Sequence, residues 1–367
     1  MTPTLAECLD RRRNDLAAVR VLAATAVLHA HAWYVSTRGL KTEDFFQVLA
    51  FTLDFHAVHA FFILSGLLLT RSLMAQRDLT RFVVARLVRY VPGVFVAALF
   101  AALVVGPLVT TLPLEQYFAS GVAKFVLKIA TLADVDATLP GVFAGNPQPG
   151  TLFIPLWTIH YELVFAAALG VAGAVRLLRF RTLVVLGIVA AAAVNIVWFW
   201  NGEEHLRLGT PHHLVRFGST FGIGVALAIF ADRIPVSNRL LLGLATCSIP
   251  LAFSHFAALT GMLLIAYAIV CIGFAGGPVA AWLARPGAWS YGFYVWGFLV
   301  EQTIIYAVPG ASGWTVFFVA LPIALFAGWL SWRFVERPCI ARTDAITAAL
   351  RAPFARAGDA SVAAKRD

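Results

Sequence analysis

The chain has 367 residues, of which 60% are hydrophobic and 13% are charged, and its mean hydropathy is +0.82. Soluble domains are about a quarter charged, so this composition excludes an ordinary soluble enzyme and predicts an all-α, polytopic helical membrane protein. The formal net charge is +9. It does not indicate a nucleic-acid partner, because the basic residues form short clusters between apolar runs, as topology signals do.

Apolar runs of about 17–25 residues mark candidate transmembrane helices. The sequence predicts about ten of them, at 16–35, 46–69, 90–111, 152–174, 182–200, 214–231, 239–254, 256–275, 288–308 and 314–333. With this arrangement most of the 28 Lys and Arg residues, including Arg11–Arg13, fall on one side of the membrane. The positive-inside rule then predicts that both termini are cytoplasmic.

These spans predict one integral-membrane domain over residues 1–343. A cytoplasmic tail over 344–367 is Ala- and Arg-rich, and we expect it to be loosely ordered or helical near lipid. The longest external segment, 112–151, contains the Pro/Gly-rich sequence LPGVFAGNPQPG at 139–150 and is long enough to form part of an acceptor site or a lid. The four cysteines lack metal-binding or redox spacing, which predicts free thiols.

The first predicted span carries Arg20 near one end and His29 and His31 near the other. At 100° per residue, Arg20 and His31 lie on one helix face, about 17 Å apart along the axis, whereas His29 points to the opposite side. Charged groups within a membrane are costly and usually functional, so His31 is the better candidate for a cavity shared with Arg20. The alternative is that these side chains only reach toward the two membrane interfaces.

Further polar residues recur in the following spans. Arg86 and Arg89 lie one helical turn apart, which suits a polyphosphate but also an ordinary positive-inside cluster. Glu162 lies well inside an apolar run, where it needs a cavity or an ion-pair partner. His56 and His59 share a face, but two histidines are too few for a metal site, and we expect none.

The order of these segments resembles the acyltransferase-3 family of integral-membrane acyltransferases, over about residues 14–342. The resemblance rests on Arg20 and His31, followed by these motifs in order: FFILSGLLL, Arg86-x-x-Arg89 before a proline, LPGVF, LWTIHYE (156–162), SYGFYVWGF (290–298) and FVERP (334–338). The chain departs from the family at Val295–Trp296–Gly297, where many relatives have a histidine, and at Phe153–Ile154–Pro155, where relatives often have Asn-Gly-Ser. These departures leave the core motifs intact.

The resemblance implies transfer of an acyl group, usually acetyl, from cytoplasmic acyl-coenzyme A to a hydroxyl of a cell-surface glycan or lipid-linked saccharide. Histidine suits the role of base or nucleophile, so we expect catalysis by His31. We expect Glu162 to orient the imidazole of His31 or to stabilise its protonated form, and Arg20, Arg86 and Arg89 to bind the phosphates of acetyl-CoA or another acyl-CoA.

Two other classes remain open at this stage. A transporter or flippase for a lipid-linked sugar could use the same charged channel, and an inactive scaffold of a polysaccharide assembly system could retain the fold. The resemblance and the basic loops suggest the bacterial inner membrane. The possible partners are membrane lipids, a glycan or glycolipid acceptor, and another copy of the chain or of the polysaccharide-biosynthesis machinery.

Overall fold

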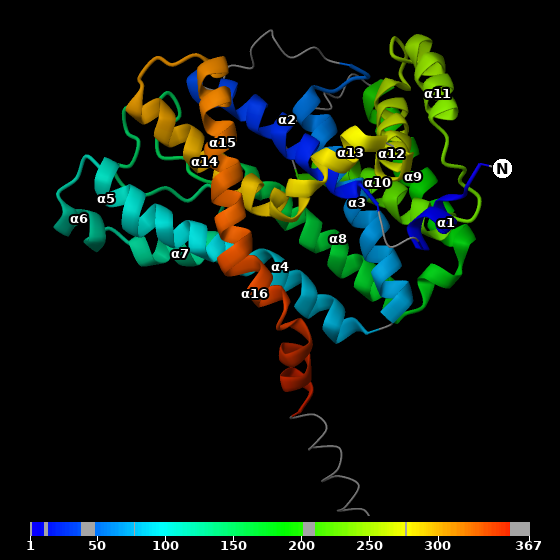
Figure 1. Cartoon of the computed structure of the whole chain (residues 1–367), viewed down its shortest axis with the longest axis horizontal. Coiled ribbons are helices and arrows are strands. Elements are labelled where there is room, and N and C mark those ends of the chain that lie inside the picture. The colour runs from blue at the N-terminus through cyan, green and yellow to red at the C-terminus, as the bar shows by residue number, and fades with distance from the viewer. Residues whose placement is uncertain are drawn as a thin grey trace, which may run out of the picture.

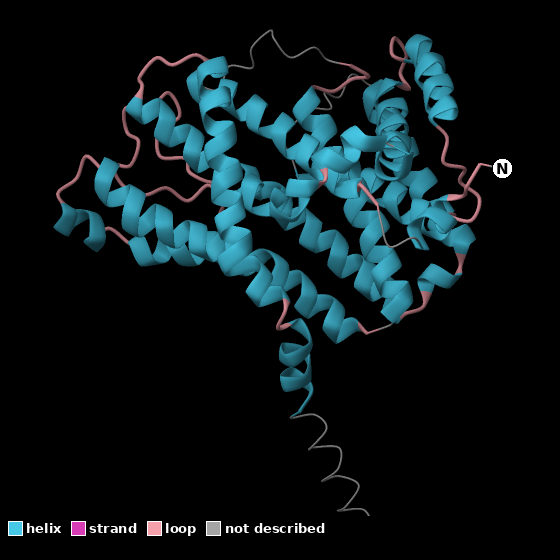
Figure 2. Cartoon of the chain, in the orientation of Figure 1, coloured by secondary structure: helices cyan, strands magenta, loops and turns pink. Residues whose placement is uncertain are grey.

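The structure is a computed structural model that describes residues 2–10, 14–37, 48–76, 78–200, 210–275 and 277–352. Within these ranges the chain is helical and contains isolated bridges but no β-strand (Figure 2). The prediction of an all-α fold is therefore confirmed. The basic cluster Arg11–Arg13 and most of the predicted tail, 353–367, lie outside the described residues.

In the described part of the chain, nine long helices form the body of the molecule (Figure 1). They are α2 (Leu16–Ser36), α3 (Leu53–Gln76), α4 (Leu79–Phe100), α8 (Trp157–Ala174), α9 (Arg181–Trp200), α10 (Thr210–Ile229), α12 (Ala257–Ala275), α14 (Ser290–Ala307) and α15 (Gly313–Ser331). Shorter helices in the described ranges are α1 (Leu5–Asp10), α5 (Gly106–Val109), α6 (Leu114–Ala119), α7 (Val122–Ala130), α11 (Asn238–Leu251), α13 (Gly277–Leu283) and α16 (Arg337–Ile340).

Seven helical segments in the described part of the chain are long and apolar enough to cross a membrane. They are Leu16–Ser36, Leu53–Gln76, Leu79–Val109, Ile154–Ala174, Arg181–Trp198, Ala257–Ala275 and Gly313–Ala352. The other three predicted spans correspond to α10, α11 and α14. Helix α11 has 14 residues, so it would extend about 21 Å, less than the thickness of the hydrocarbon core. The count of ten spans and the cytoplasmic position of both termini stay predictions.

Helices α3 and α10 approach each other closely through two glycines. A Cβ atom added at Gly66 would lie 2.1 Å from the carbonyl oxygen of Phe221, and one added at Gly224 would lie 2.1 Å from that of Ile63. Without a strong hydrophobic force between helices in lipid, small residues stabilise helix pairs by permitting such backbone contact. Ser65, the residue directly before Gly66, donates a hydrogen bond from α3 to Glu162 of α8.

Two of the long helices contain π-helical turns. Helix α4 continues through Ala101–Val105 into α5, and α15 continues through Trp332–Glu336 into α16. π-Bulges change the direction of side chains and are frequent at functional sites. In the second of them, Glu336 is buried and reaches Arg89 of α4.

The long segment 112–151 is folded against the body. Helix α7 packs beside α4, α6 packs against α7, and these helices form with α5 the arm at one end of the molecule in Figure 1. The Tyr117 hydroxyl donates to the carbonyl of Ala102 at 2.7 Å, and the Asn146 amide donates to the backbone carbonyl and the side-chain oxygen of Gln302 in α14. The segment therefore has a defined position on the bundle.

At the other end of the chain, residues 343–352 form a helix after α16. The loosely ordered tail expected from 344 onward is thus helical as far as Ala352. Thr343 and Thr347, one turn apart, are buried, so one face of this helix lies on the body of the protein.

Candidate functional site

Two cavities lie in the bundle and share part of their lining. The inner cavity has a volume of about 280 Å³ and is lined by Arg20 of α2, by Arg86 and Arg89 of α4 and by Glu162 of α8. The structure thus brings together four of the five residues that the sequence nominated. Three guanidinium groups and one carboxylate give this cavity a positive charge.

Arg89 is held in place by contacts on two sides. Its Nη1 lies 3.5 Å from Oε2 of Glu336, whose other oxygen accepts a hydrogen bond from Ser331 at 3.0 Å. The guanidinium also lies over the rings of Tyr291 and Trp332, 5.3 and 5.6 Å from their centroids. Such contacts keep the rotamer of a long side chain fixed, so Arg89 is preorganised at the cavity wall.

Glu162 has partners within the inner cavity. Its Oε1 accepts hydrogen bonds from the Ser65 hydroxyl and from the Tyr90 hydroxyl, the latter at 2.5 Å, and its charge acts on Arg20. The carboxylate therefore balances part of the arginine charge. The expectation that Glu162 orients His31 is not supported, because these two residues line different cavities and the hydrogen bonds of Glu162 go to Ser65 and Tyr90.

Arg86 provides an unused donor. Its Nε is buried and has no hydrogen-bond partner among the described residues. A buried donor without an acceptor costs free energy, typically about 1–3 kcal/mol. A ligand with anionic oxygens in the inner cavity would satisfy this group.

The outer cavity is larger, about 880 Å³, and its lining side chains have the opposite formal charge. Its lining includes His31 and the carboxylates of Asp54, Asp134 and Asp136, together with aromatic residues such as Trp157. Its described lining contains no Lys or Arg. Residues 132–136 belong to the long segment 112–151, so that segment does form part of a cavity wall, and the 2.7 Å ion pair between Lys128 and Asp134 fixes it there.

His31 and His29 have different surroundings, as the helical geometry predicted. The ring of His31 packs edge-on against Phe298, and the carboxylate of Asp54 acts on it electrostatically. His29 accepts a hydrogen bond from Trp33 and packs against Trp314 and Phe317 on the other side of α2. Of the two, His31 is the histidine that reaches a cavity.

The wall between the cavities is formed by Val58, Thr158 and Tyr294, which line both of them. The hydroxyls of Thr158 and Tyr294 are 2.7 Å apart, and the Tyr294 hydroxyl donates to the carbonyl of Pro155 at 2.5 Å. Groups bound in the two cavities are therefore separated only by side chains from α3, α8 and α14.

Several site residues were missed from the sequence. Asp54 lies inside the predicted second span, Asp134 and Asp136 lie within the predicted external segment 112–151, where carboxylates are ordinary, and Glu336 entered only as part of the FVERP motif. The one available signal was the isolation of Asp54 between apolar residues at the start of the second span. Among the described residues, no group of three or more His, Cys, Asp or Glu side chains could hold a metal ion.

Comparison with known proteins defines the class of this chain. The model of the acyltransferase-3 family, described as an acyltransferase domain, matches residues 13–333, and the chain therefore belongs to this family. It is an integral-membrane acyltransferase. It is similar to nodulation protein 10 of Rhizobium leguminosarum bv. viciae, with 28% identity over 365 residues, covering 89% of this chain and 93% of that protein. No solved structure matches the chain.

Proposed function

We propose that this acyltransferase moves an acyl group, most simply acetyl, from acyl-coenzyme A in the inner cavity to a hydroxyl of a glycan or lipid-linked saccharide in the outer cavity. The observation that carries the proposal is the opposite charge of two cavities that share one wall. An anionic, phosphate-bearing donor fits the three arginines, and an acceptor rich in hydroxyls fits the carboxylates and aromatic rings.

The donor would be bound by its phosphates. Arg20, Arg86 and Arg89 line one cavity from two helices, Arg89 is fixed by Glu336, and Arg86 has an unused buried Nε donor. Guanidinium forks match phosphate oxygens in geometry and charge. Once the phosphates are held there, the acyl end of the donor is directed toward the wall at Tyr294.

His31 would act as the base. Its imidazole takes the proton from the acceptor hydroxyl, the oxygen forms a bond to the thioester carbon, and the carbon–sulfur bond breaks. The coenzyme thiolate leaves and receives the proton from His31, so the residue ends the cycle neutral. Asp54, whose charge acts on His31, stabilises the imidazolium that forms in between, as a carboxylate does beside a catalytic histidine.

The test uses purified protein in lipid, radiolabelled acetyl-coenzyme A, and a pool of envelope glycans and glycolipids. We expect label in a glycan fraction with wild type and at least about a hundredfold less with Arg89→Gln, since bidentate phosphate contacts are among the strongest hydrogen bonds. Substrate flux across the bilayer without coenzyme binding would instead favour a transporter. Neither flux nor transfer, with intact fold, would favour a scaffold.

A further inference from the structure

The inner cavity is closed at one end by the last helix of the described chain. Ile340 at the end of α16 and Thr343 in the next turn both line it. From there the helix over 343–352 runs along the beginning of α4, with Thr343 and Thr347 buried against the body. A ligand as large as an acyl-coenzyme A therefore meets this helix at the mouth of the cavity.

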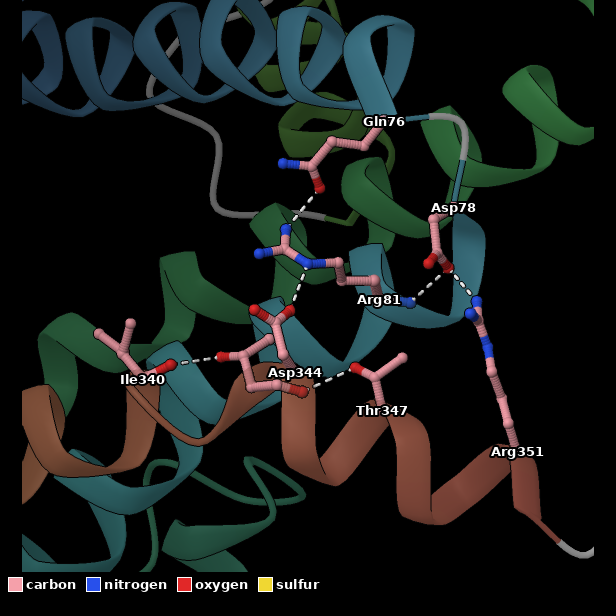
Figure 3. Close-up of polar contacts among 8 residues, drawn as sticks. Gln76, Asp78, Arg81, Ile340, Asp344, Thr347 and Arg351 are labelled. Carbon is pink, nitrogen blue, oxygen red and sulfur yellow. Dashed lines mark hydrogen bonds and ion pairs between the residues drawn. The ribbon is translucent and has the colours of Figure 1, made fainter.

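Two ion pairs hold the helix in this position (Figure 3). Arg81 Nε donates to Oδ1 of Asp344 at 2.6 Å, and Arg351 pairs with Asp78. Both pairs join the C-terminal helix to the start of α4, and Arg81 also donates to Gln76 at the end of α3. The side chains are partly exposed, from 23% for Asp78 to 77% for Asp344, so water and salt weaken both pairs.

Arg81 is placed to continue the arginine-lined wall of the inner cavity. Arg81, Ala85 and Arg89 follow one another at four-residue spacing along α4, and Ala85 and Arg89 line the cavity. By the helical rise, Arg81 lies about 12 Å from Arg89 toward the beginning of α4. Arg81 therefore lies outside the inner cavity, next to its mouth.

We propose that Arg81 and Arg351 form an anion-binding mouth that takes a phosphate of the donor, and that the helix over 343–352 closes this mouth while Asp344 and Asp78 occupy the two guanidinium groups. The proposal rests on the proposed function, since it deepens the donor site. A phosphate offers a guanidinium more charge and more acceptor oxygens than a carboxylate does, so it displaces an exposed carboxylate partner.

Substituting each partner of the Arg81–Asp344 ion pair separately tests the proposal. Arg81→Gln and Asp344→Asn both remove the Arg81–Asp344 pair, yet only Arg81→Gln removes the proposed phosphate contact. We expect Arg81→Gln to weaken acetyl-coenzyme A binding about tenfold, the usual size of a lost charged hydrogen bond, and Asp344→Asn to strengthen it. If both variants change the affinity in the same direction, or neither changes it, the pair is only a structural clamp and the proposal is wrong.

Matched controls are available elsewhere in the chain. Arg71 and Asp10 form a 2.9 Å ion pair with similar exposure, and Arg71→Gln and Asp10→Asn should leave donor affinity unchanged. The second probe is S-acetyl-pantetheine, which has no phosphate: Arg81→Gln should not alter its binding, and an equal loss for both probes would overturn the proposal. If wild type fails to bind acetyl-coenzyme A at all, the proposed function fails. If wild type binds acetyl-coenzyme A and Arg81→Gln binds it with the same affinity, only the proposed anion-binding mouth is refuted.

Discussion

The hydroxyls of Tyr294 and Thr158 lie 2.7 Å apart in the wall that the two cavities share. This pair stands between the arginines on one side and His31 on the other. Acyl transfer between the cavities requires the reacting thioester to reach the acceptor at this wall. The same wall must limit access of water, which would otherwise compete with the acceptor for the acyl group.

Tyr294→Phe should therefore raise the ratio of donor hydrolysis to acyl transfer. The substitution removes the hydrogen bonds of Tyr294 to Thr158 and to the carbonyl of Pro155. The wall between the cavities then has one hydrogen-bonding group fewer and packs less tightly. Release of free coenzyme and labelled product are measured in parallel. Tyr291→Phe, which loses a buried hydroxyl on the same helix away from the wall, is the control. An unchanged ratio in Tyr294→Phe would show that the wall does not control access.

Asp54 and Glu162 should have separable effects on the kinetics. Asp54→Asn removes the carboxylate that acts on His31 and should lower kcat about tenfold or more, with little change in the KM of the donor. Glu162→Gln disturbs the arginine cavity through Ser65 and Tyr90 and should chiefly change the donor KM. Steady-state kinetics on both variants checks this. A lower kcat with an unchanged donor KM in Glu162→Gln would indicate that Glu162 takes part in the chemical step.

We expect Gln302 to affect binding of the acceptor, because its side chain holds the segment 112–151 in place. Its side-chain nitrogen donates to the carbonyls of Gln148 and Thr151 at 2.7 and 2.9 Å, and its side-chain oxygen accepts from Asn146. Gln302→Leu leaves these buried groups unsatisfied, each costing about 1–3 kcal/mol. We expect faster proteolysis within 132–151 and a higher acceptor KM, with donor affinity as in wild type. An equal loss of affinity for the donor and for the acceptor would indicate global unfolding instead.

Asp78, between α3 and α4, should make the stability of the fold depend on pH in the acidic range. It caps α4: Oδ1 accepts the backbone N–H of Arg81 at 2.9 Å, and this bond, with the nearby charge of Arg351, holds the pKa of Asp78 below its ordinary value of 3.8. A lowered folded-state pKa stabilises the fold above about pH 3.8, and this contribution is lost as the pH falls through the folded-state pKa.

The measurement compares the apparent melting temperatures of wild type and Asp78→Ala across pH. At neutral pH, loss of an N-cap should cost about 1 kcal/mol, and the difference between the two proteins should shrink below pH 3.8. Asp10→Asn is the control, because the exposed carboxylate of Asp10, at the end of α1, pairs with Arg71 and is not the N-cap of a described helix. A difference that stays constant with pH would mean that Asp78 acts by packing and not by its charge.

The sequence predicted the helical fold well, because membrane spans are marked by long apolar runs whose backbone must be satisfied internally. It also grouped Arg20, Arg86 and Arg89, which line one cavity, since helical spacing and the cost of charge in lipid are local properties. Their role in binding phosphate stays a prediction. The face argument distinguished His31 from His29 for the same reason.

What the sequence could not supply was the partner of each charge. Glu162 was paired with His31 because both are isolated polar residues, but partner choice depends on how α3, α4 and α8 pack, and the carboxylate meets Ser65 and Tyr90. The charge of Asp54 acts on His31 from another helix, and residues 132–136 line the outer cavity only because a long segment folds back onto the bundle. These interactions join residues far apart in the chain and leave no periodic signal.

If His31 is the catalytic base at the wall that the two cavities share, single-turnover acyl transfer should depend on it. Wild type, His31→Ala and His29→Ala are loaded with radiolabelled acetyl-coenzyme A and mixed with the acceptor pool. We predict label in the glycan with wild type and His29→Ala, and none with His31→Ala although it still binds the donor. Transfer by His31→Ala at the wild-type rate, or loss of transfer in His29→Ala alone, would rule out His31 as the catalytic base.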